Sequence, residues 1–312
     1  MDALAAIQGD STWADTLRSY LPKVARSQAP VLITGETGTG KERIAQAVHD
    51  LSPRRKNRFV AINCAALPEG LIETELFGHE RGAFTGAVTR YDGRAAQADG
   101  GTLFLDEIGE MSLTGQAKLL RFLEAGKIDR IGATRESTVD VRFVAATNQS
   151  LEDLVAEHRF RADLYYRLNV ARIEVDPLRT RPDDIHVLAE SYIEELNRRA
   201  GCAVEGPDRR LARLFESYNW PGNVRELRNM LEAVFIDPPE GQISVTDLPP
   251  AFQALVSGHR TALSSEKDDL IEALNRTKWN KAEAARLLNM SRMSVYRKIE
   301  KYRIARSPLA PR

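Results

Sequence analysis

The chain has 312 residues, which is enough to bury a sizeable core and to form more than one domain. Apolar residues make up 43% and charged residues 28%, the N-terminus carries no secretory signal, and no apolar run approaches the roughly 20 residues that span a bilayer. The net charge is zero, and the two distant cysteines, Cys64 and Cys202, lack metal-ligand spacing, which argues against a disulfide scaffold and favours a reduced, cytoplasmic protein.

Short β-rich runs alternate with helical stretches over residues 30–175. Stretches such as 42–51 and 114–123 have helical spacing, and alternation of this kind predicts an α/β layered sheet. The runs are apolar and β-branched, as buried parallel strands are. The predicted strands are Val31–Thr34, Phe59–Asn63, Thr102–Leu105, Val141–Thr147 and Ala171–Val175.

A glycine-rich loop, G-x-x-x-x-G-K, follows the first predicted strand and opens a helix. Its glycines let backbone N–H groups converge on phosphate oxygens, the helix N-terminus adds its own donors, and Lys41 reaches the β- and γ-phosphates. Glu42 stands where a Ser or Thr usually contacts Mg²⁺, so another group or water must replace that ligand. A chance glycine loop is the alternative, which the strand–loop–helix context disfavours. The residues expected to bind nucleotide are Gly35, Glu36, Thr37, Gly38, Thr39, Gly40, Lys41 and Glu42.

A hexapeptide, Gly-Ala-Phe-Thr-Gly-Ala, lies between this phosphate loop and the next acidic strand. A phosphate site predicts that a chain handles nucleotide but not what the energy is used for. This glycine-flanked aromatic loop is the feature that narrows the answer. Its residues are Gly82, Ala83, Phe84, Thr85, Gly86 and Ala87.

Two carboxylates end the apolar strand at 102–105. Asp106 is expected to hold Mg²⁺, directly or through water, and Glu107 to act as general base toward the attacking water. Surface termination of a strand is the alternative. Asn148 ends the next strand, where it could orient the lytic water or sense the γ-phosphate, although Asn is common at strand ends.

Two arginines, Arg161 and Arg167, lie in the segment 160–168. An arginine supplied in trans can stabilise the transition state of phosphoryl transfer, whereas surface salt bridges would explain the spacing equally well. The pattern then becomes helical, with amphipathic stretches at 182–200, 207–218 and 222–235. Arg225 opens the last of these and is a candidate sensor of nucleotide, its alternative being a solvated helix charge.

The C-terminal tail is basic. Residues 259–312 hold 13 Lys and Arg against 6 Asp and Glu, a net charge of +7, which favours contact with a polyanion. Three short helices are predicted from Ser265, with Asn280 as an N-cap and Ala285, Leu288, Val295 and Ile299 buried between helices. This matches a helix-turn-helix, whose last helix enters the major groove; a plain helical hairpin with a basic face is the alternative. The candidates to contact double-stranded DNA are Ser291, Arg292, Ser294, Arg297 and Lys298, while Leu270, Ile271 and Leu274 are expected to pair with their copies in a dimer.

Taken together, these motifs resemble one family. The chain is similar to the bacterial enhancer-binding proteins, the AAA+ ATPase activators of sigma-54 RNA polymerase, from about residue 8 to about residue 304. Its tail resembles the Fis-type domain that ends many of them. The motifs that carry the resemblance, in order, are Gly35–Glu42, Glu75–Glu80, Gly82–Ala87, Gly101–Glu107, Phe160–Leu168 and Trp220–Leu227.

The resemblance implies ATP and Mg²⁺ as cofactors and gives each site residue a role. Gly35–Glu42 is the Walker A loop, and Asp106 with Glu107 the Walker B pair. Asn63 resembles the family's switch asparagine, which contacts Glu107 in a nucleotide-dependent way. Thr147 with Asn148 resembles sensor I.

The remaining implied roles concern partners. Arg161 and Arg167 resemble arginine fingers that reach a neighbouring subunit, and Arg225 resembles sensor II. Phe84 and Thr85 resemble the loop tip that contacts sigma-54, and a second insertion, around residues 130–138, moves with it.

The predicted organisation is α/β with two α-helical parts. An AAA+ P-loop parallel-sheet domain is expected over residues 1–176, an α-helical lid over 177–250, a linker over 251–264 and a Fis-type helix-turn-helix domain over 265–312. The expected activity is ATP hydrolysis that remodels the closed promoter complex of the sigma-54 RNA polymerase holoenzyme from enhancer DNA. The expected assembly runs from a dimer to a hexameric ring.

Some alternatives stay open. An AAA+ remodeller of a different client is disfavoured by Phe84 and Thr85, and a binding-only regulator is disfavoured by the intact Lys41 and Glu107. Many family members carry an N-terminal regulatory domain, whereas the ATPase pattern here begins within about ten residues of Met1. Control by a separate protein in trans and removal of such a domain are both compatible with this.

Overall fold

The computed structural model describes residues 4, 7–254, 270–271, 273–277, 279–288, 290–302 and 304. It contains two compact units, Met1–Ile243 and Ser244–Arg312. Each unit is described by itself. Within the described ranges, no helix has both the length and the apolar character needed to cross a membrane.

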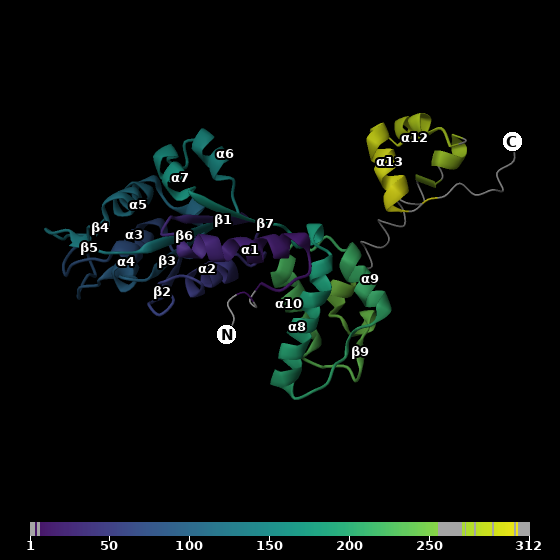
Figure 1. Cartoon of the computed structure of the whole chain (residues 1–312), viewed down its shortest axis with the longest axis horizontal. Helices are drawn as coiled ribbons and strands as arrows, with labels where there is room; N and C mark the ends of the chain where they lie inside the picture. Colours follow the sequence, from purple (N-terminus) through teal and green to yellow (C-terminus); the bar gives the residue numbers. More distant parts are fainter. Residues whose placement is uncertain are drawn as a thin grey trace. The chain divides into compact units, whose positions relative to one another are not determined.

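A parallel five-stranded sheet in the order β2-β3-β6-β1-β7 forms the centre of the first unit (Figure 1). All five predicted strands are confirmed to within a residue at their ends. They could be predicted because buried parallel strands consist of short β-branched and apolar runs. The strands are β1 (Val31–Gly35), β2 (Phe59–Asn63), β3 (Thr102–Asp106), β6 (Arg142–Thr147) and β7 (Ala171–Val175).

Side chains of successive strand residues point to opposite faces, so the sheet has a core on each side. On one face, Ile33, Phe104 and Val144 pack against α1 (Thr12–Arg26) and α2 (Lys41–Asp50). On the other face, Leu32, Leu105 and Phe143 pack against the remaining helices of the domain. Those helices are α3 (Glu69–Phe77), α4 (Gly93–Gln97), α5 (Leu113–Ala125), α6 (Leu151–Ala156) and α7 (Ala162–Leu168).

Helix α1 was not predicted from the sequence. Its signals are present, since Ser11 caps it by accepting from the backbone N–H of Ala14, and its buried residues Leu17, Leu21 and Val24 have helical spacing. Pro22 interrupts the pattern within the helix and hides these signals.

Three helices make the lid: α8 (Asp183–Ala200), α9 (Arg209–Ser217) and α10 (Asn223–Val234). They agree with the three predicted helices. Trp220 is 1% exposed, stacks edge-on with Phe215 at 5.5 Å between ring centroids, and donates its indole N–H to the carbonyl of Phe215. This aromatic pair anchors the turn that leads into α10.

Short elements complete the first unit. Two-residue strands form a parallel pair in the lid and an antiparallel pair in the α/β domain, and single 3₁₀ turns follow β3 and β7. They are η2 (Ile108–Glu110), β4 (Lys127–Ile128), β5 (Ser137–Thr138), η3 (Leu178–Thr180), β8 (Gly206–Pro207) and β9 (Gln242–Ile243).

The second unit begins with η4 (Val245–Asp247) and helical residues 250–254; most of the predicted linker lies outside the described residues. Residues 270–271 and 273–276 are helical and precede α12 (Lys281–Leu287) and α13 (Arg292–Lys301). Asn280 caps α12 as predicted, accepting from the N–H groups of Ala282 and Glu283. The predicted core residues are confirmed: Ala285 and Val295 are buried, and Leu288 and Ile299 pack against them.

One tail prediction is not supported. Leu270 and Leu274 are 1% and 0% exposed because they pack against the tail's own α12 and α13 core. They are therefore occupied within one chain, and of the three residues expected to pair with a copy only Ile271 keeps a partly open side chain.

Candidate functional site

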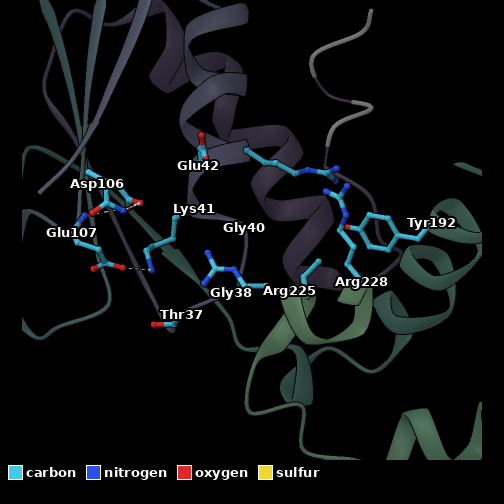
Figure 2. A pocket seen from close by; sticks show the side chains of 13 residues that line it. Thr37, Gly38, Gly40, Lys41, Glu42, Asp106, Glu107, Tyr192, Arg225 and Arg228 are labelled. Carbon is cyan, nitrogen blue, oxygen red and sulfur yellow. Dashed lines mark hydrogen bonds and ion pairs between the residues drawn. The ribbon is translucent and has the colours of Figure 1, made fainter. Parts of the chain in front are cut away.

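The carboxyl ends of β1 and β3 meet the lid around a cavity of about 300 Å³ (Figure 2). In the view of Figure 2, the Asp106 and Glu107 carboxylates lie on one side of Lys41, and Arg225 and Arg228 lie on the other. The lining residues are Thr37, Gly38, Gly40, Lys41, Glu42, Arg43, Asn63, Asp106, Glu107, Tyr192, Val224, Arg225 and Arg228. The predicted glycine loop, acidic pair and lid arginine thus surround one space.

Lys41 begins α2, directly after Gly40, and is 6% exposed. Its ammonium group donates to the carbonyls of Gly35 at 2.9 Å and Glu36 at 3.3 Å, and lies 3.6 Å from the Glu107 carboxylate. A buried cation with these partners is held in place at the loop where phosphate oxygens are expected.

The acidic pair continues from β3. Asp106 ends the strand, and Glu107 has a left-handed backbone with φ 51°. Strained backbone of this kind is concentrated at functional sites, where the surrounding structure enforces it. Burial and the neighbouring charge of Glu107 raise the pKa of Asp106, and Lys41 opposes that shift.

Asparagines fix the two carboxylates. The backbone N–H of Asn148 donates to Glu107 at 3.0 Å, and the Asn148 side chain donates to the Thr37 hydroxyl at 2.8 Å. Asn63 donates to Asp106 at 3.3 Å, so its contact in this structure is with Asp106 rather than Glu107. The strand ends and the glycine loop are therefore joined by one hydrogen-bonded set.

The lid side of the cavity contains residues that the sequence analysis missed. Arg43 on α2 and Arg228 on α10 both lie over the ring of Tyr192 on α8, at 5.7 and 5.8 Å from its centroid. Together with Arg225 they make this wall cationic. Their only sequence signal is an arginine one turn after Arg225 and another two residues after Lys41.

A second, smaller cavity of about 40 Å³ adjoins the first and shares Gly40, Arg43 and Val224 with it. Its other lining residues are mostly apolar or long-chained: Ile7, Gln8, Trp13, Thr39, Ile44, Arg181 and Leu188. An apolar recess beside a phosphate loop suits a flat aromatic ring.

Glu36 differs from the rest of the loop. Its carboxylate accepts two hydrogen bonds from Arg179, at 2.6 and 2.8 Å, and one from Asn223 at 3.2 Å. Hydrogen bonding from Arg179 is the largest cause that lowers the pKa of Glu36 to about 2. The Glu36 side chain is thus bonded to Arg179 and Asn223, whereas its backbone forms part of the phosphate loop.

Arg161 and Arg167 lie elsewhere. Neither is among the described residues that line the cavity, and both are exposed at the ends of α7. Arg161 forms an ion pair with Asp163 at 2.7 Å.

The hexapeptide loop lies at the surface between α3 and α4. A hydrogen bond from Gly82 N–H to the Ala87 carbonyl closes it, and Ala87 is buried at its base. Phe84 is 42% exposed and meets the ring of His79 edge-on at 5.0 Å, while Thr85 is exposed. The turn thus presents an aromatic and a hydroxyl side chain outward.

The second insertion is in contact with this loop. It forms a hairpin of β4 and β5, and Arg130 donates to Glu80 at 2.9 Å. A Cβ added to Gly132 would come within 2.9 Å of the Cβ of Ala83. The two surface segments therefore share packing and an ion pair.

The predicted DNA-contacting residues gather at α13. Ser291 caps the helix by accepting from Ser294 N–H, and Arg292 and Arg297 are exposed. Lys298 is half-buried and donates to the sulfur of Met290. The exposed face also carries two residues that the sequence analysis missed, Met293 and Tyr296, at 67% and 51% exposure.

Three known protein families match successive parts of the chain. Residues 7–174 match the sigma-54 interaction domain, residues 179–265 match the AAA+ ATPase lid domain, and residues 264–302 match the bacterial regulatory proteins of the Fis family. The chain belongs to the sigma-54 activator family. The first of these matches alone covers more than half of the chain.

Related proteins agree with the activator family. The chain is 48% identical over 286 residues to the Nif-specific regulatory protein of Azotobacter vinelandii, covering 88% of this chain and 55% of that protein. It is 43% identical over 301 residues to the transcriptional regulatory protein ZraR of Klebsiella oxytoca, covering 94% and 68%. The chain therefore spans little more than half the length of the nitrogen-fixation regulator.

Solved structures agree as well. Crystal structures of NtrX from Brucella abortus in complex with ADP and with ATP match with TM-scores of 0.76 and 0.75, at 31% and 32% identity. Each match covers 95% of this chain and 69% of that one. The activator family and the α/β P-loop fold are thus established together.

Proposed function

We propose that the chain is an ATP-hydrolysing activator of the sigma-54 RNA polymerase holoenzyme, which it remodels from the closed toward the open promoter complex while bound to upstream enhancer DNA. The observation that carries this proposal is that one α/β domain supplies both the glycine loop and Asp–Glu pair of the cavity and the surface loop Gly82–Ala87. We assign residues 1–176 to the ATPase domain, 177–250 to the lid, 251–264 to a linker and 265–312 to the DNA-binding domain. A role on chromosomal DNA would put the protein in the cytoplasm.

The cavity suits a nucleoside triphosphate. Lys41 and Arg225 supply cationic donors for the phosphates, and the adjoining apolar recess lies where the base would extend. The complexes of the related NtrX with ADP and ATP support the same ligand here.

Asp106 is suited to Mg²⁺ because it offers hard carboxylate oxygens at the cavity wall, and Glu42 lies on the same lining. When bound, Mg²⁺ would neutralise charge on the phosphate oxygens. Asn63 and the Glu107 N–H hold the two oxygens of Asp106 in position.

Glu107 would accept a proton from the attacking water. Its carboxylate is oriented by Asn148 N–H and by Lys41, and the residue lines the cavity. The water oxygen forms the new bond to the γ-phosphorus as the bond to the β-phosphate oxygen breaks, which yields ADP and phosphate.

Arg161 and Arg167 would act on a neighbouring subunit. Both are exposed on α7 and stand apart from their own cavity. An arginine that stabilises transition-state charge from outside needs each site to lie at a subunit boundary, which a closed ring of like subunits provides. We therefore propose assembly from a dimer to a hexameric ring.

The Gly82–Ala87 loop would contact sigma-54 through Phe84 and Thr85. The contacts of Arg130 and Gly132 with the base of the loop give the second insertion a route to move it. Asn63 would transmit nucleotide state by exchanging its contact with Asp106 for one with Glu107.

The tail would bind enhancer DNA through α13. Arg292 and Arg297 can bond guanine edges, and Ser291, Ser294 and Lys298 can hold phosphates. Exposed Met293 and Tyr296 add apolar surface for thymine methyl groups.

In-vitro transcription on a supercoiled sigma-54 promoter with an upstream site tests the whole proposal. Wild-type protein and ATP should yield open complexes with sigma-54 holoenzyme and none with a holoenzyme of another sigma class. ATP hydrolysis without open complexes would instead indicate a different client. Removal of residues 259–312 should abolish the footprint at the upstream site and leave hydrolysis intact; an unchanged footprint would contradict the role of the tail.

A further inference from the structure

Three residues from distant parts of the chain join the lid to the phosphate loop. Arg179, in the turn before α8, holds Glu36 with two hydrogen bonds, and Asn223, at the start of α10, donates to the Glu36 carboxylate at 3.2 Å. Asn223 also donates to the backbone carbonyl of Thr37 at 3.1 Å. We call Glu36, Arg179 and Asn223 the lid latch.

Asn223 is built into this position. It is fully buried, its φ is 51°, and its side-chain carbonyl accepts from the Leu178 N–H at 2.8 Å. Both ends of its amide are thus used, one by the segment before the lid and one by the phosphate loop. A buried amide with both ends hydrogen-bonded, on a strained backbone, indicates that the surrounding structure holds Asn223 in this conformation.

The latch reaches the loop through backbone carbonyls. Asn223 binds the carbonyl of Thr37, and the N–H of Arg225 donates to the carbonyl of Gly38 at 3.1 Å. In a planar trans peptide the C=O and the following N–H point in opposite directions. Holding these two carbonyls from the lid side therefore fixes the directions of the Gly38 and Thr39 N–H groups.

The approach is too close for any side chain. A Cβ on Gly38 would lie 2.3 Å from the Gly222 carbonyl oxygen, and Gly38 has φ 80°. The glycine loop and the lid are consequently in direct backbone contact at the point where the latch closes.

We propose that the lid latch couples the lid to the phosphate loop: Glu36, Arg179 and Asn223 are positioning residues that set nucleotide affinity, and nucleotide in turn sets the orientation of the lid that carries Arg225. This inference rests on the proposed nucleotide function. It assigns a use to the Glu36 side chain that differs from contact with phosphate.

A double-mutant cycle tests the coupling. In the full chain, Glu36→Gln and Arg179→Gln should each raise the Kd for a fluorescent ATP analogue by about five- to tenfold, within the range of typical coupling energies. The double variant should be no weaker than either single variant, because both remove the same bridge. KM for ATP should rise with Kd, whereas kcat should change less, since the Glu107 carboxylate is held by the Asn148 N–H and by Lys41.

Arg199→Gln is the matched control, because Arg199 pairs with Glu195 on the same lid helix and does not line the cavity. It should leave Kd unchanged. Asn223→Gly keeps a residue that accepts positive φ while deleting the amide, and it should raise Kd as the Glu36 variant does.

Thermal melting separates a coupling role from a structural one. Glu36 and Arg179 are 43% and 42% exposed, so their variants should melt near the wild type. Unchanged Kd in the two single variants, additive effects in the double variant, or a fall in kcat at unchanged KM would each overturn the inference. Failure of the wild type to bind the analogue would overturn the proposed function itself.

Discussion

The nucleotide cavity and the Gly82–Ala87 loop belong to the same compact unit but are held in opposite ways. In the cavity, Lys41 donates to the Gly35 and Glu36 carbonyls and lies beside the Glu107 carboxylate, which in turn accepts from the Asn148 N–H. In the loop, the closing bond joins Gly82 to Ala87, and Thr85 is exposed. Chemistry requires groups fixed within a fraction of an ångström, whereas loops that engage a partner are drawn from the less stable parts of a protein. The contrast distinguishes the cavity, which acts on nucleotide, from the loop, which is proposed to contact the partner protein.

The largest expected effect comes from breaking the cavity alone. Glu107→Gln should lower ATP turnover by about 10²–10⁴-fold, because the amide cannot accept the proton of water, while nucleotide binding persists. Phosphate release and analogue binding measure the two. Glu110→Gln is the control, since this nearby carboxylate does not line the cavity. Brisk hydrolysis by Glu107→Gln would remove Glu107 from its role.

A substitution in the Gly82–Ala87 loop should have the opposite effect, in which ATP hydrolysis persists and activation is lost. Thr85→Ala should abolish open-complex formation while hydrolysis stays within about twofold of wild type, as expected for an exposed residue outside the catalytic set. Permanganate reactivity of the promoter and phosphate release report the two activities. Thr89→Ala, an exposed threonine of the same segment, should activate normally. Sigma-54 transcription by Thr85→Ala would show that the loop assignment is wrong.

A smaller effect is expected from substitutions in the C-terminal tail. They should weaken DNA binding without directly changing the nucleotide cavity or the Gly82–Ala87 loop. Arg297→Ala should weaken binding to the upstream site by about tenfold or more, since a base contact contributes about 1–3 kcal/mol of discrimination. Arg286→Ala, on α12, should weaken specific binding less. Quantitative footprinting at fixed salt compares them, and equal losses would indicate a general charge effect instead of base recognition.

The smallest effect concerns pH. Hydrogen bonding from Arg179 lowers the pKa of Glu36 to about 2. The contribution of the charged carboxylate to the latch is therefore complete above the usual pKa of a glutamate, and it is lost only as the pH falls toward about 2. The ratio of Kd values for Glu36→Gln and wild type should therefore stay constant from about pH 5 to about pH 9. A ratio that shrinks between neutral pH and about pH 5 would contradict a permanently charged latch.

Sequence patterns could predict most of the sheet and one wall of the cavity. The strands were found because buried runs such as Val31–Thr34 are apolar and β-branched, and the acidic pair because it follows such a run. Helix α1 was missed because Pro22 masks its period. The latch could not be found, since residues 36, 179 and 223 meet only after the lid folds onto the loop. Tyr192 was missed for the same reason, as a buried aromatic in a helix reads as ordinary core.

The backbone contact between Gly38 and Gly222 has a consequence for protein engineering. Because a Cβ on Gly38 would collide with the backbone carbonyl of Gly222, the phosphate loop and the lid cannot be exchanged independently between family members. A chimaera that receives a foreign lid must keep glycine at position 38 and bring asparagine to position 223, or else must lose the close approach. The boundary for grafting therefore lies outside the residues 36–225 that these contacts join, and the two domains pass between proteins as one cassette.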